Sequence, residues 1–218
     1  VIPHNTHFIN EYVVTSWYRS GTRIHDVTYP HNMIEVGFYD TSPLSGDGYN
    51  SHWGTYPWLP SGRIISSDVE MGLYIFDPTY MRGCYLEGTV TELESGTPLS
   101  AADVEIICPT IMEATDIAGD YATGTATAGT YDVAFSMAGY FPDTAYSVTL
   151  TNGVLTIQDM ALVPMTPFAF TGQVQQSWDA AGIAGAQVLI ENQDFSFWLT
   201  ADGSGNFNIP SMFAGDYD

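Results

Sequence analysis

Five histidines are the side chains of this sequence best suited to bind a metal ion. All of them lie in its first third: His4, His7, His25, His31 and His52. His4 and His7 could offer two imidazoles to one ion, but residues three apart on a strand point to opposite faces. The pair therefore fits a metal only if the chain turns there and a third ligand comes from another element. The alternative is a packing role among aromatic rings.

Two short acidic loops are the candidates for calcium. Asp202-Gly-Ser-Gly-Asn206 offers several oxygens, and Asp116-Ile-Ala-Gly119 offers fewer. Neither has the spaced carboxylates and terminal glutamate of an EF-hand. An aspartate that accepts bonds from the following amides, with a glycine at positive φ, makes a tight turn. The sequence favours a turn in both loops, with calcium as the one cofactor left open.

The two cysteines, Cys84 and Cys108, have a spacing that suits a disulfide. If residues 86–90 form a hairpin with residues 104–108 in a symmetric register, the two cysteines lie opposite each other. Both then lie on the same face of the sheet, because strand side chains alternate. We predict this bridge, which implies an oxidising compartment. The alternative is a pair of buried free thiols.

The other polar and aromatic residues form no recognisable catalytic set. The sequence has no Gly-x-Ser-x-Gly elbow, and no Ser–His–Asp arrangement follows from its spacing. Aromatic residues gather at Trp17, Tyr18, Trp53, Tyr56 and Trp58. These rings could stack on a sugar, but packing between sheets is the stronger interpretation. We therefore predict that the chain is not an enzyme.

The charge excludes two classes of partner. The chain of 218 residues has 25 acidic residues, four arginines and no lysine, for a net charge of -21. Such a chain is repelled by phosphate backbones and anionic lipid, so we expect no nucleic-acid binding. No apolar run approaches the roughly 20 residues that span a bilayer, so we expect no membrane span. Because Val1 is not a natural start, we expect a longer parent chain.

An internal duplication sets the organisation of the chain. Residues 88–131 recur, imperfectly, at residues 172–217. The offset is 84 as far as Ile190 and 86 from Asp202 onward, so the second copy contains a two-residue insertion. A period of this length indicates tandem domains. Scaffolds and binding modules often occur in such arrays, which favours a modular, non-catalytic protein.

Almost every segment is typical of a strand or a turn. Residues 131–137 alternate between apolar and polar, as a half-buried strand does. Asn152-Gly153 separates the apolar segments 148–150 and 155–157, which predicts a hairpin. Strand-like segments recur about every ten residues with Gly, Pro or Asp between them, as in a sandwich or barrel.

The first third contains a second, shorter repeat. Gly21-Thr-Arg-Ile-His-Asp26 recurs as Gly72-Leu-Tyr-Ile-Phe-Asp77, at an offset of 51. Short strands with such a period are typical of propeller blades. We expect strands at residues 6–9, 12–18, 22–27 and 34–39, which would complete one blade. Residues 63–67 and 72–76 would belong to the next blade.

The first third resembles the closing blades of the choice-of-anchor B family, extracellular bacterial proteins with propeller-type repeats. The matching segments are His4-Asn5, residues 16–27, residues 35–41, residues 53–62 and residues 67–76. The family name refers to variable C-terminal anchoring, including signals of the Bacteroidetes type 9 secretion pathway. The resemblance implies export and surface display, and it implies no reaction.

Residues 84–164, and again 168–218, resemble the carboxypeptidase regulatory-like domain, a seven-stranded sandwich with a transthyretin-like fold. The pattern comprises Gly88-x-Val90, Leu99-x-x-Ala102-x-Val104-x-Ile106, Thr115-Asp116-x-x-Gly119-x-Tyr121, Gly129-x-Tyr131 and Gly139-Tyr140. The second copy has Ala201 where the threonine is usual, and it stops at Asp218 in the middle of the pattern. Such modules are usually spacers or binding units of secreted proteins.

One modification motif fits this setting. Asp143-Thr144-Ala145 matches the Asp-Ser/Thr-apolar motif of Bacteroidetes O-glycosylation. Because we expect it in a loop, Thr144 is the candidate glycosylation site.

The sequence thus predicts an all-β chain. Residues 1–79 would be the C-terminal part of a β-propeller, residues 80–164 a seven-stranded β-sandwich, and residues 165–218 a second, truncated one. We expect a spacer, stalk or adhesion scaffold that is extracellular or displayed at the cell surface. Its partners would be other domains of the same chain, homo-oligomer or filament contacts, or secretion machinery. The alternatives are a filament or coat subunit, and a metal-dependent enzyme with its site in further blades.

The second sandwich would lack about a third of its module. The missing strands would cover the inward faces of Val174, Val188, Ile190 and Phe207. We therefore expect that residues 168–218 are not stable alone, because exposed apolar faces and free strand edges favour association.

Overall fold

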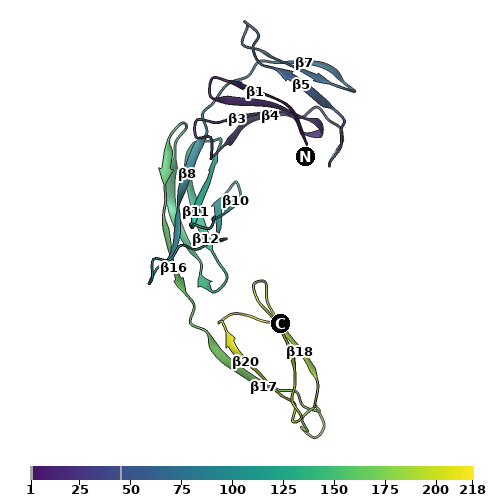
Figure 1. Cartoon of the computed structure of the whole chain (residues 1–218), viewed down its shortest axis with the longest axis vertical. Coiled ribbons are helices and arrows are strands. Elements are labelled where there is room, and N and C mark those ends of the chain that lie inside the picture. Colours follow the sequence, from purple (N-terminus) through teal and green to yellow (C-terminus); the bar gives the residue numbers. More distant parts are fainter. Residues whose placement is uncertain (1, 45) are drawn as a thin grey trace. The chain divides into compact units, whose positions relative to one another are not determined.

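The computed structural model describes residues 2–44 and 46–218, and nearly all of its regular structure is β-strand (Figure 1). By its internal contacts the chain divides into two compact units. The first unit comprises Val1–Thr91, Pro98–Phe135 and Thr144–Met160. The second comprises Glu92–Thr97, Ser136–Asp143 and Ala161–Asp218. The expected division at residues 79 and 164 stays a prediction.

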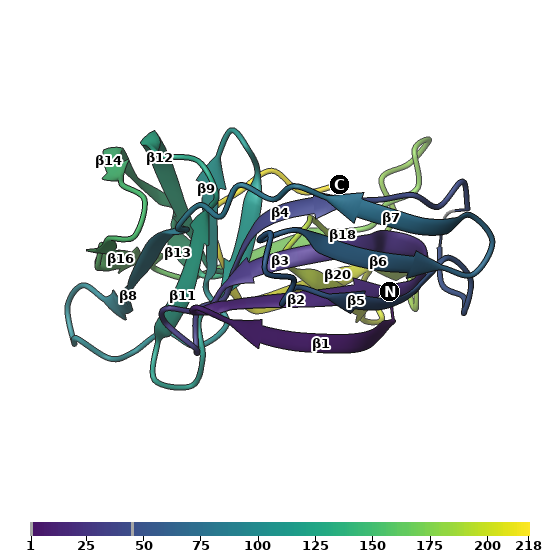
Figure 2. The same cartoon turned by 90° about the horizontal axis from the view of Figure 1, so that it is seen from above.

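The first third forms two antiparallel sheets that pack on each other (Figure 2). One has the order β1-β2-β3-β4 and the other the order β5-β6-β7. The six expected strands of this region are confirmed as β1 (Pro3–Ile9), β2 (Tyr12–Trp17), β3 (Gly21–Asp26), β4 (Ile34–Tyr39), β6 (Ile64–Asp68) and β7 (Gly72–Phe76). The strand β5 (His52–Tyr56) and a 3-10 turn at Tyr18–Ser20 were not expected.

The core between these two sheets is unusually polar. Val14 and Ile64 are fully buried, but so are Ser16 and His52. Ser16 Oγ donates to the carbonyl of Trp53 at 3.1 Å, which joins β2 to β5. Buried polar groups need such partners because an unmet one costs about 1–3 kcal/mol. The two sheets are therefore held by oriented hydrogen bonds as well as by apolar contact.

The middle of the chain is a sandwich of two sheets with the orders β10-β9-β12-β14 and β11-β8-β16-β13, and β15 also pairs with β8. The strands are β8 (Cys84–Glu92), β9 (Asp103–Ile107), β10 (Ile111–Ala114), β11 (Asp120–Thr125), β12 (Gly129–Ser136), β13 (Tyr140–Phe141), β14 (Asp143–Leu150), β15 (Leu155–Ile157) and β16 (Met160–Pro164). The sheets contain four and five strands instead of the seven strands expected, because the short β13 and β15 also pair.

Two predicted hairpins in this sandwich are wrong. β8 pairs with β11 and β9 pairs with β10, so the expected hairpin of residues 86–90 with 104–108 does not form. The Asn152-Gly153 turn exists, but it connects β14 in one sheet to β15 in the other. Both errors have one cause, because local turn chemistry does not reveal whether the chain crosses between sheets.

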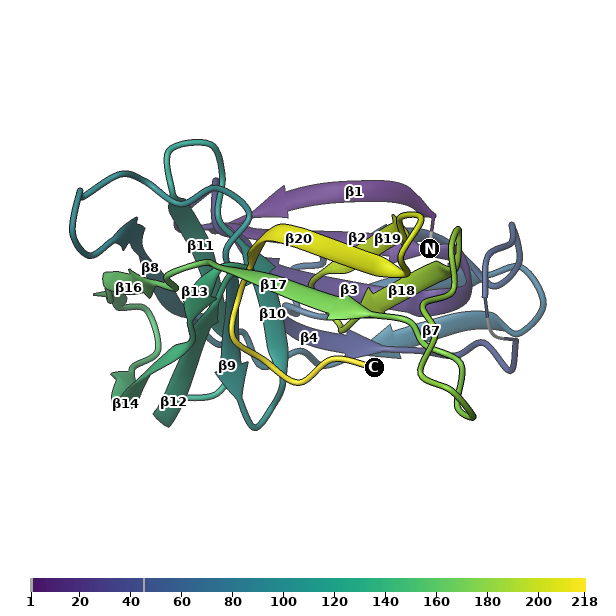
Figure 3. The ribbon, with the colours of Figure 1, turned by 90° about the horizontal axis from the view of Figure 1, so that it is seen from below.

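The C-terminal part repeats the strand pairing of the sandwich (Figure 3). It consists of β17 (Phe168–Gln173), β18 (Gln187–Glu191), β19 (Ser196–Thr200) and β20 (Asn206–Met212). β17 pairs with β20 as β8 pairs with β11: Gly172 lies opposite Phe207, and Gly88 lies opposite Tyr121. Adding 84 to the number of Gly88 and 86 to that of Tyr121 therefore gives the paired residues Gly172 and Phe207.

The second pair of strands repeats in the same way. Gln187 lies opposite Thr200 in β18 and β19, as Asp103 lies opposite Ala114 in β9 and β10. The isolated bridge of Thr91 with Pro98 recurs as Gln175 with Gly182. The duplication in the sequence is therefore a duplication of hydrogen-bond register.

The predicted Cys84–Cys108 bridge is not present. Both cysteines are free; Cys84 is buried in β8, and Cys108 is exposed directly after β9. Their strands lie in different sheets. The prediction failed because it depended on the hairpin between these strands.

The two thiols should differ in reactivity. Cys84 has no exposed surface, and burial raises its pKa, so little thiolate is accessible there. We expect a maleimide to modify Cys108 of the native chain and to reach Cys84 only after unfolding. Mass spectrometry before and after denaturation, without reductant, measures this. If the denatured chain takes up no maleimide at either cysteine, the two thiols are bridged, and the predicted disulfide would be correct after all.

Candidate functional site: the junction at Asp26 and Arg82

The most extensively bonded buried charge in the described chain is Asp26, at the end of β3. Its side chain has no exposed surface. Oδ1 accepts hydrogen bonds from Thr28 N at 3.1 Å, Thr28 Oγ1 at 2.7 Å and Arg82 Nη1 at 3.1 Å. Oδ2 accepts from Gly83 N at 2.8 Å. One carboxylate thus binds both its own loop and the segment that enters β8.

Arg82 completes this junction from the other side. Its Nη2 donates to Glu11 Oε2 at 2.5 Å, and its guanidinium lies 4.9 Å from the centre of the Tyr12 ring. A planar guanidinium suits such a position because it can donate in several directions and stack on a ring at once. Arg82 therefore connects the turn between β1 and β2 to Asp26.

The Asn152-Gly153 turn also reaches the junction. Asn152 Nδ2 donates to the carbonyls of Arg82 and Ala126, and Gly153 N donates to the carbonyl of Gly83 at 2.7 Å. The turn that failed as a hairpin signal therefore fixes residues 82–83 against the sandwich. We name Asp26, Thr28, Arg82, Gly83 and Asn152 the junction clamp.

A second set of contacts lies beside the clamp. Asn32 is 3% exposed, and its Nδ2 donates to Glu87 Oε1 at 3.1 Å and to the carbonyl of Thr123 at 3.0 Å. Ile34 packs so closely that a Cβ on Gly83 would lie 2.7 Å from the Ile34 side chain. The close approach of the Ile34 side chain therefore favours glycine at position 83.

The electrostatics favour the ionised form of Asp26. Burial alone raises the pKa of this carboxyl, but the hydrogen bonds from Thr28 and Gly83 outweigh burial, and the net pKa is lowered. A carboxyl with a lowered folded pKa stabilises the fold above its unfolded pKa, and this contribution is lost as the pH falls through the folded value. The clamp should therefore hold at neutral pH and release in strong acid.

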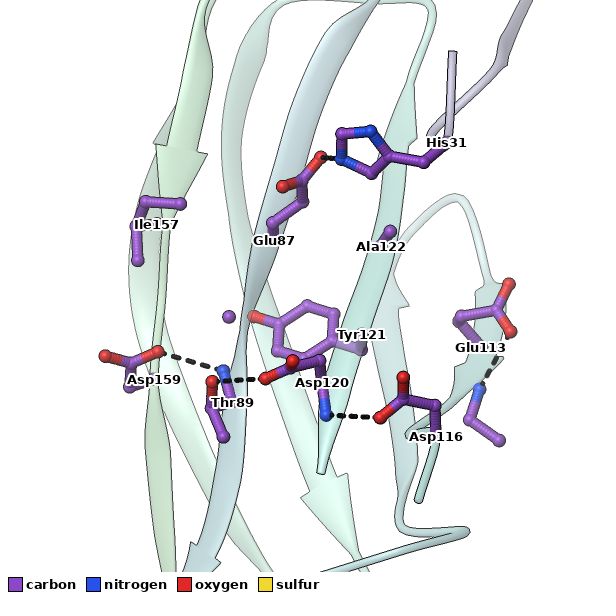
Figure 4. Close-up of a pocket in the computed structure, with 12 residues that line it drawn as sticks. His31, Glu87, Thr89, Glu113, Asp116, Asp120, Tyr121, Ala122, Ile157 and Asp159 are labelled. Atoms are coloured by element: carbon purple, nitrogen blue, oxygen red, sulfur yellow. Dashed lines mark hydrogen bonds and ion pairs between the residues drawn. The ribbon is translucent and has the colours of Figure 1, made fainter. Parts of the chain in front are cut away.

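An open acidic cavity of about 680 Å³ lies next to the second contact set (Figure 4). Its carboxylates are Glu87, Glu113, Asp116, Asp120 and Asp159. Each has a partner within the protein: for example, Thr89 Oγ1 donates to Asp120 Oδ1 at 2.7 Å, and Thr89 N donates to Asp159 Oδ1 at 2.9 Å. Through Thr89, Asp120 and Asp159 thus join β8 to β11 and to the residue before β16.

The structure places His4 and His7 against aromatic rings. The His4 ring lies 4.3 Å from that of Trp53, and the His7 ring lies 4.6 Å from that of Trp58. His4 Nδ1 also bonds the carbonyl of Trp53. Within residues 2–44 and 46–218, no group of three or more His, Cys, Asp or Glu is arranged to hold a metal. A metal at His4 and His7 stays a prediction, and the packing alternative describes their contacts.

Both acidic loops are tight turns, as the sequence favoured. Asp202 Oδ1 accepts from Ser204 N at 2.7 Å and Asn206 N at 2.9 Å, with Gly205 at a φ of 81°. Asp116 makes the same two bonds to the equivalent amides. The oxygens are thus engaged by backbone donors, and calcium stays an untested prediction.

Thr144 lies in β14, where a loop was expected. It is half-buried at the start of that strand. The expected loop is therefore wrong, and O-glycosylation at Thr144 stays a prediction.

Sequence reasoning missed the clamp, although a signal for it was present. Asp26 and Asp77 occupy the same position of the 51-residue repeat. Only Asp26 is buried; the Asp77 side chain is 79% exposed and lies 3.7 Å from Arg63. A repeated aspartate, in a chain with four arginines, was the available indication of an ionic contact.

We predict that the stability of the first third depends on pH through two buried histidines, His25 and His52. Burial is the main cause that lowers the pKa of both imidazoles, and nearby Asp68 and Glu35 oppose it. Because the unfolded state binds protons more readily, stability should fall as the pH drops below the unfolded histidine pKa of about 6.5. Thermal melts between about pH 7.5 and pH 5.5 test this. His52→Asn should flatten the profile, and an unchanged slope would refute the assignment.

Comparison with known proteins identifies one class of domain. Residues 85–163 match the carboxypeptidase regulatory-like domain, so the chain contains such a domain in its middle. No curated protein matches the chain. No helix of the described residues is long and apolar enough to cross a membrane.

Solved structures with similar strand arrangements include two pilins. A streptococcal ancillary pilin aligns over 97% of this chain and 69% of its own, with a TM-score of 0.43 and 9% identity. A shaft pilin of Lactobacillus rhamnosus GG aligns over 62% and 84%, with a TM-score of 0.33 and 14% identity. A putative carbohydrate-binding protein of Bacteroides uniformis aligns over 62% and 76%, with a TM-score of 0.32 and 15% identity. The domain match is therefore the comparison that bears on function.

Proposed function

We propose that this chain is a non-catalytic, modular segment of an exported bacterial protein that is extracellular or displayed at the cell surface. It acts as a spacer, stalk or adhesion scaffold. The observation that carries the proposal is the junction clamp, in which the buried Asp26 bonds Arg82 and Gly83. The carboxypeptidase regulatory-like domain, typically a non-catalytic unit, supports it.

The clamp supports a scaffold because it restricts motion between consecutive parts of the chain. Domains joined by a simple linker move relative to each other by default. Here the entering segment 82–83 is bonded on two sides, by Asp26 and by the Asn152-Gly153 turn. A spacer gains reach from such stiffness.

The propeller assignment and the export route belong to the same proposal. The four-stranded antiparallel order β1-β2-β3-β4 and its packing on β5-β6-β7 support two propeller blades. The resemblance to choice-of-anchor B proteins supports a type 9 secretion route, with secretion machinery and other domains of a longer chain as partners. We propose a Bacteroidetes source on the same ground.

Surface exposure is the direct test. A tagged parent protein in its bacterial host is treated with protease on intact cells, and a cytoplasmic protein serves as the control. We expect the tagged protein to be cleaved while the control survives. Cleavage only after lysis would contradict the proposal.

A filament or coat subunit is the second candidate. The carboxypeptidase regulatory-like domain, typically a non-catalytic unit, is compatible with it. Filament contacts should each bury more than about 1,000 Å². Light scattering over a wide concentration range measures assembly, and a constant monomer mass would exclude this candidate.

A further inference from the structure

The turn between β14 and β15 contains a dipeptide with its own reactivity. Asn152 is the only asparagine of the sequence that is followed by glycine, and both residues of the pair are exposed. Asparagine is a thermally labile residue. Its side-chain amide is lost most readily before glycine, because no Cβ keeps the next backbone nitrogen away from the asparagine Cγ. The turn thus combines a reactive pair of residues with access to water.

Two hydrogen bonds hold the amide group that this reaction would expel. Asn152 Nδ2 donates to the carbonyl of Arg82 and, at 3.1 Å, to the carbonyl of Ala126. Ring closure joins the Asn152 Cγ to Gly153 N and removes Nδ2 from the side chain. Both contacts must therefore break before the amide can leave.

A third hydrogen bond holds the nitrogen that would attack. Gly153 N donates to the carbonyl of Gly83 at 2.7 Å. An amide nitrogen attacks only after it loses its proton, and base-catalysed amide hydrogen exchange begins with the same loss. A hydrogen-bonded amide exchanges when its bond opens. Reaction at Asn152 and exchange at Gly153 should therefore depend on the same opening of the junction clamp.

We propose that Asn152 is a site of spontaneous deamidation that the closed junction clamp restrains, and that the modified residue keeps the clamp open. The site needs water as its only co-reactant and no enzyme. The inference concerns the chemistry of the clamp and does not rest on the extracellular role.

The reaction has two steps. In the first, Gly153 N gives up its proton and bonds to the Asn152 Cγ, the bond from Cγ to Nδ2 breaks, and Nδ2 leaves as ammonia with that proton. In the second, water opens the cyclic imide. Cleavage between Gly153 N and Cγ gives aspartate, and cleavage between Gly153 N and the backbone carbonyl carbon of residue 152 gives isoaspartate. The net change is the gain of one water and the loss of one ammonia.

Both products weaken the clamp. The Nδ2 donor is replaced by a carboxylate, which only accepts hydrogen bonds when it is ionised. The carbonyls of Arg82 and Ala126 therefore lose their donor and meet a negative charge instead. Isoaspartate also adds a carbon atom to the backbone before Gly153, which displaces its amide from the carbonyl of Gly83. The bonds that fix residues 82–83 against the sandwich are then not restored when the chain closes again.

The first experiment measures the rate of modification in the full chain. The chain is incubated at mildly alkaline pH, and mass spectrometry that separates aspartate from isoaspartate quantifies both at residue 152. Asp26→Asn weakens the clamp and leaves the Asn-Gly pair unchanged, because an NH₂ group replaces an oxygen that accepts from Arg82 or Gly83. We expect conversion at Asn152 to be at least about tenfold faster in this variant.

Asn50-Ser51 is the control within each sample. Asn50 Oδ1 accepts from Arg19 Nη2 at 2.7 Å, and its Nδ2 donates to Glu70 Oε1 at 2.9 Å, so its contacts are separate from the clamp. We expect the same conversion at Asn50 in both chains. An unchanged rate at Asn152 would overturn the inference. Equal acceleration at Asn50 and Asn152 would also overturn it, because the restraint would then be general to the fold.

The second experiment starts from the product. Asn152→Asp places the carboxylate directly in the full chain. Thr151→Asp is the matched control, because it adds the same charge at an exposed neighbour that is not part of the clamp. We expect hydrogen exchange in residues 80–86 to be about tenfold faster in Asn152→Asp than in Thr151→Asp, since only the first removes the donor.

Equal exchange in these two variants would show that the modified residue does not open the clamp, and the inference would be wrong. The second experiment needs no Asp26 variant, so it decides this part even if Asp26→Asn does not fold. Neither experiment depends on where the protein resides. Failure here is therefore distinct from failure of the proposed function.

Discussion

Asp26→Asn is expected to lower the free energy of opening at the junction clamp by about 3 kcal/mol. The amide places an N–H₂ group where a carboxylate oxygen accepted bonds, so either Gly83 N or Arg82 loses its acceptor. The Asp26 side chain is fully buried, which makes an unmet donor costly. The Arg82 side chain is 36% exposed, so water offsets part of the lost charge interaction.

Hydrogen exchange with mass spectrometry on the full chain measures this effect. Peptides that cover residues 80–86 and 150–156 should exchange faster in the variant, because both segments bond the clamp. Asp77→Asn is the matched control: it occupies the same repeat position but forms an exposed contact with Arg63. We expect the control to cost less than about 0.5 kcal/mol. Equal effects of the two variants would show that the clamp does not stabilise the junction.

Gly88→Ala is expected to destabilise the first sandwich by about 3 kcal/mol, through overpacking and the loss of one buried hydrogen bond. A Cβ at Gly88 would lie 2.1 Å from the carbonyl oxygen of Gln158. That oxygen accepts a bond from the Tyr121 hydroxyl at 2.6 Å. The backbone must therefore move, and Tyr121, which is 4% exposed, loses its partner.

Gly172→Ala tests the same repeat position in a different environment. Its Cβ would meet the ring of Phe207 at 2.3 Å, and a half-buried ring can turn away more easily than a backbone can. We expect a cost below about 1 kcal/mol. Exchange in β8 and β17 peptides compares the two variants directly. A larger effect at Gly172 than at Gly88 would contradict the assigned role of the Gln158 carbonyl.

The sequence was most informative where the two modules repeat. The offsets of 84 and 86, derived from residues such as Gly88 and Tyr121, also relate the hydrogen-bonded pairs of the structure. This agreement has a physical reason. The Asp116 and Asp202 turns each fix the direction and spacing of the strand that follows, so conserving the turn conserves the register.

The long-range pairings could not be predicted in this way. The Cys84–Cys108 register and the Asn152-Gly153 hairpin were both local inferences, and each segment crosses to another sheet. The junction clamp was missed because Asp26 and Asp77 have the same sequence context, and only tertiary contact buries one of them. Strands follow from alternation and turns, but the choice of partner depends on the burial of the whole sandwich.

The arginine of the clamp is also the last point at which a trypsin-like protease could cut this sequence. The chain has four arginines and no lysine, and residues 83–218 contain neither. The bond after Arg82 is held on both sides, because Gly83 N donates to Asp26 and the Gly83 carbonyl accepts from Gly153. A protease needs an extended, unbonded segment, so the closed clamp shields this bond. Cleavage of the bond between Arg82 and Gly83 would therefore report each opening of the junction. Residues 83–218 would then be released as one fragment.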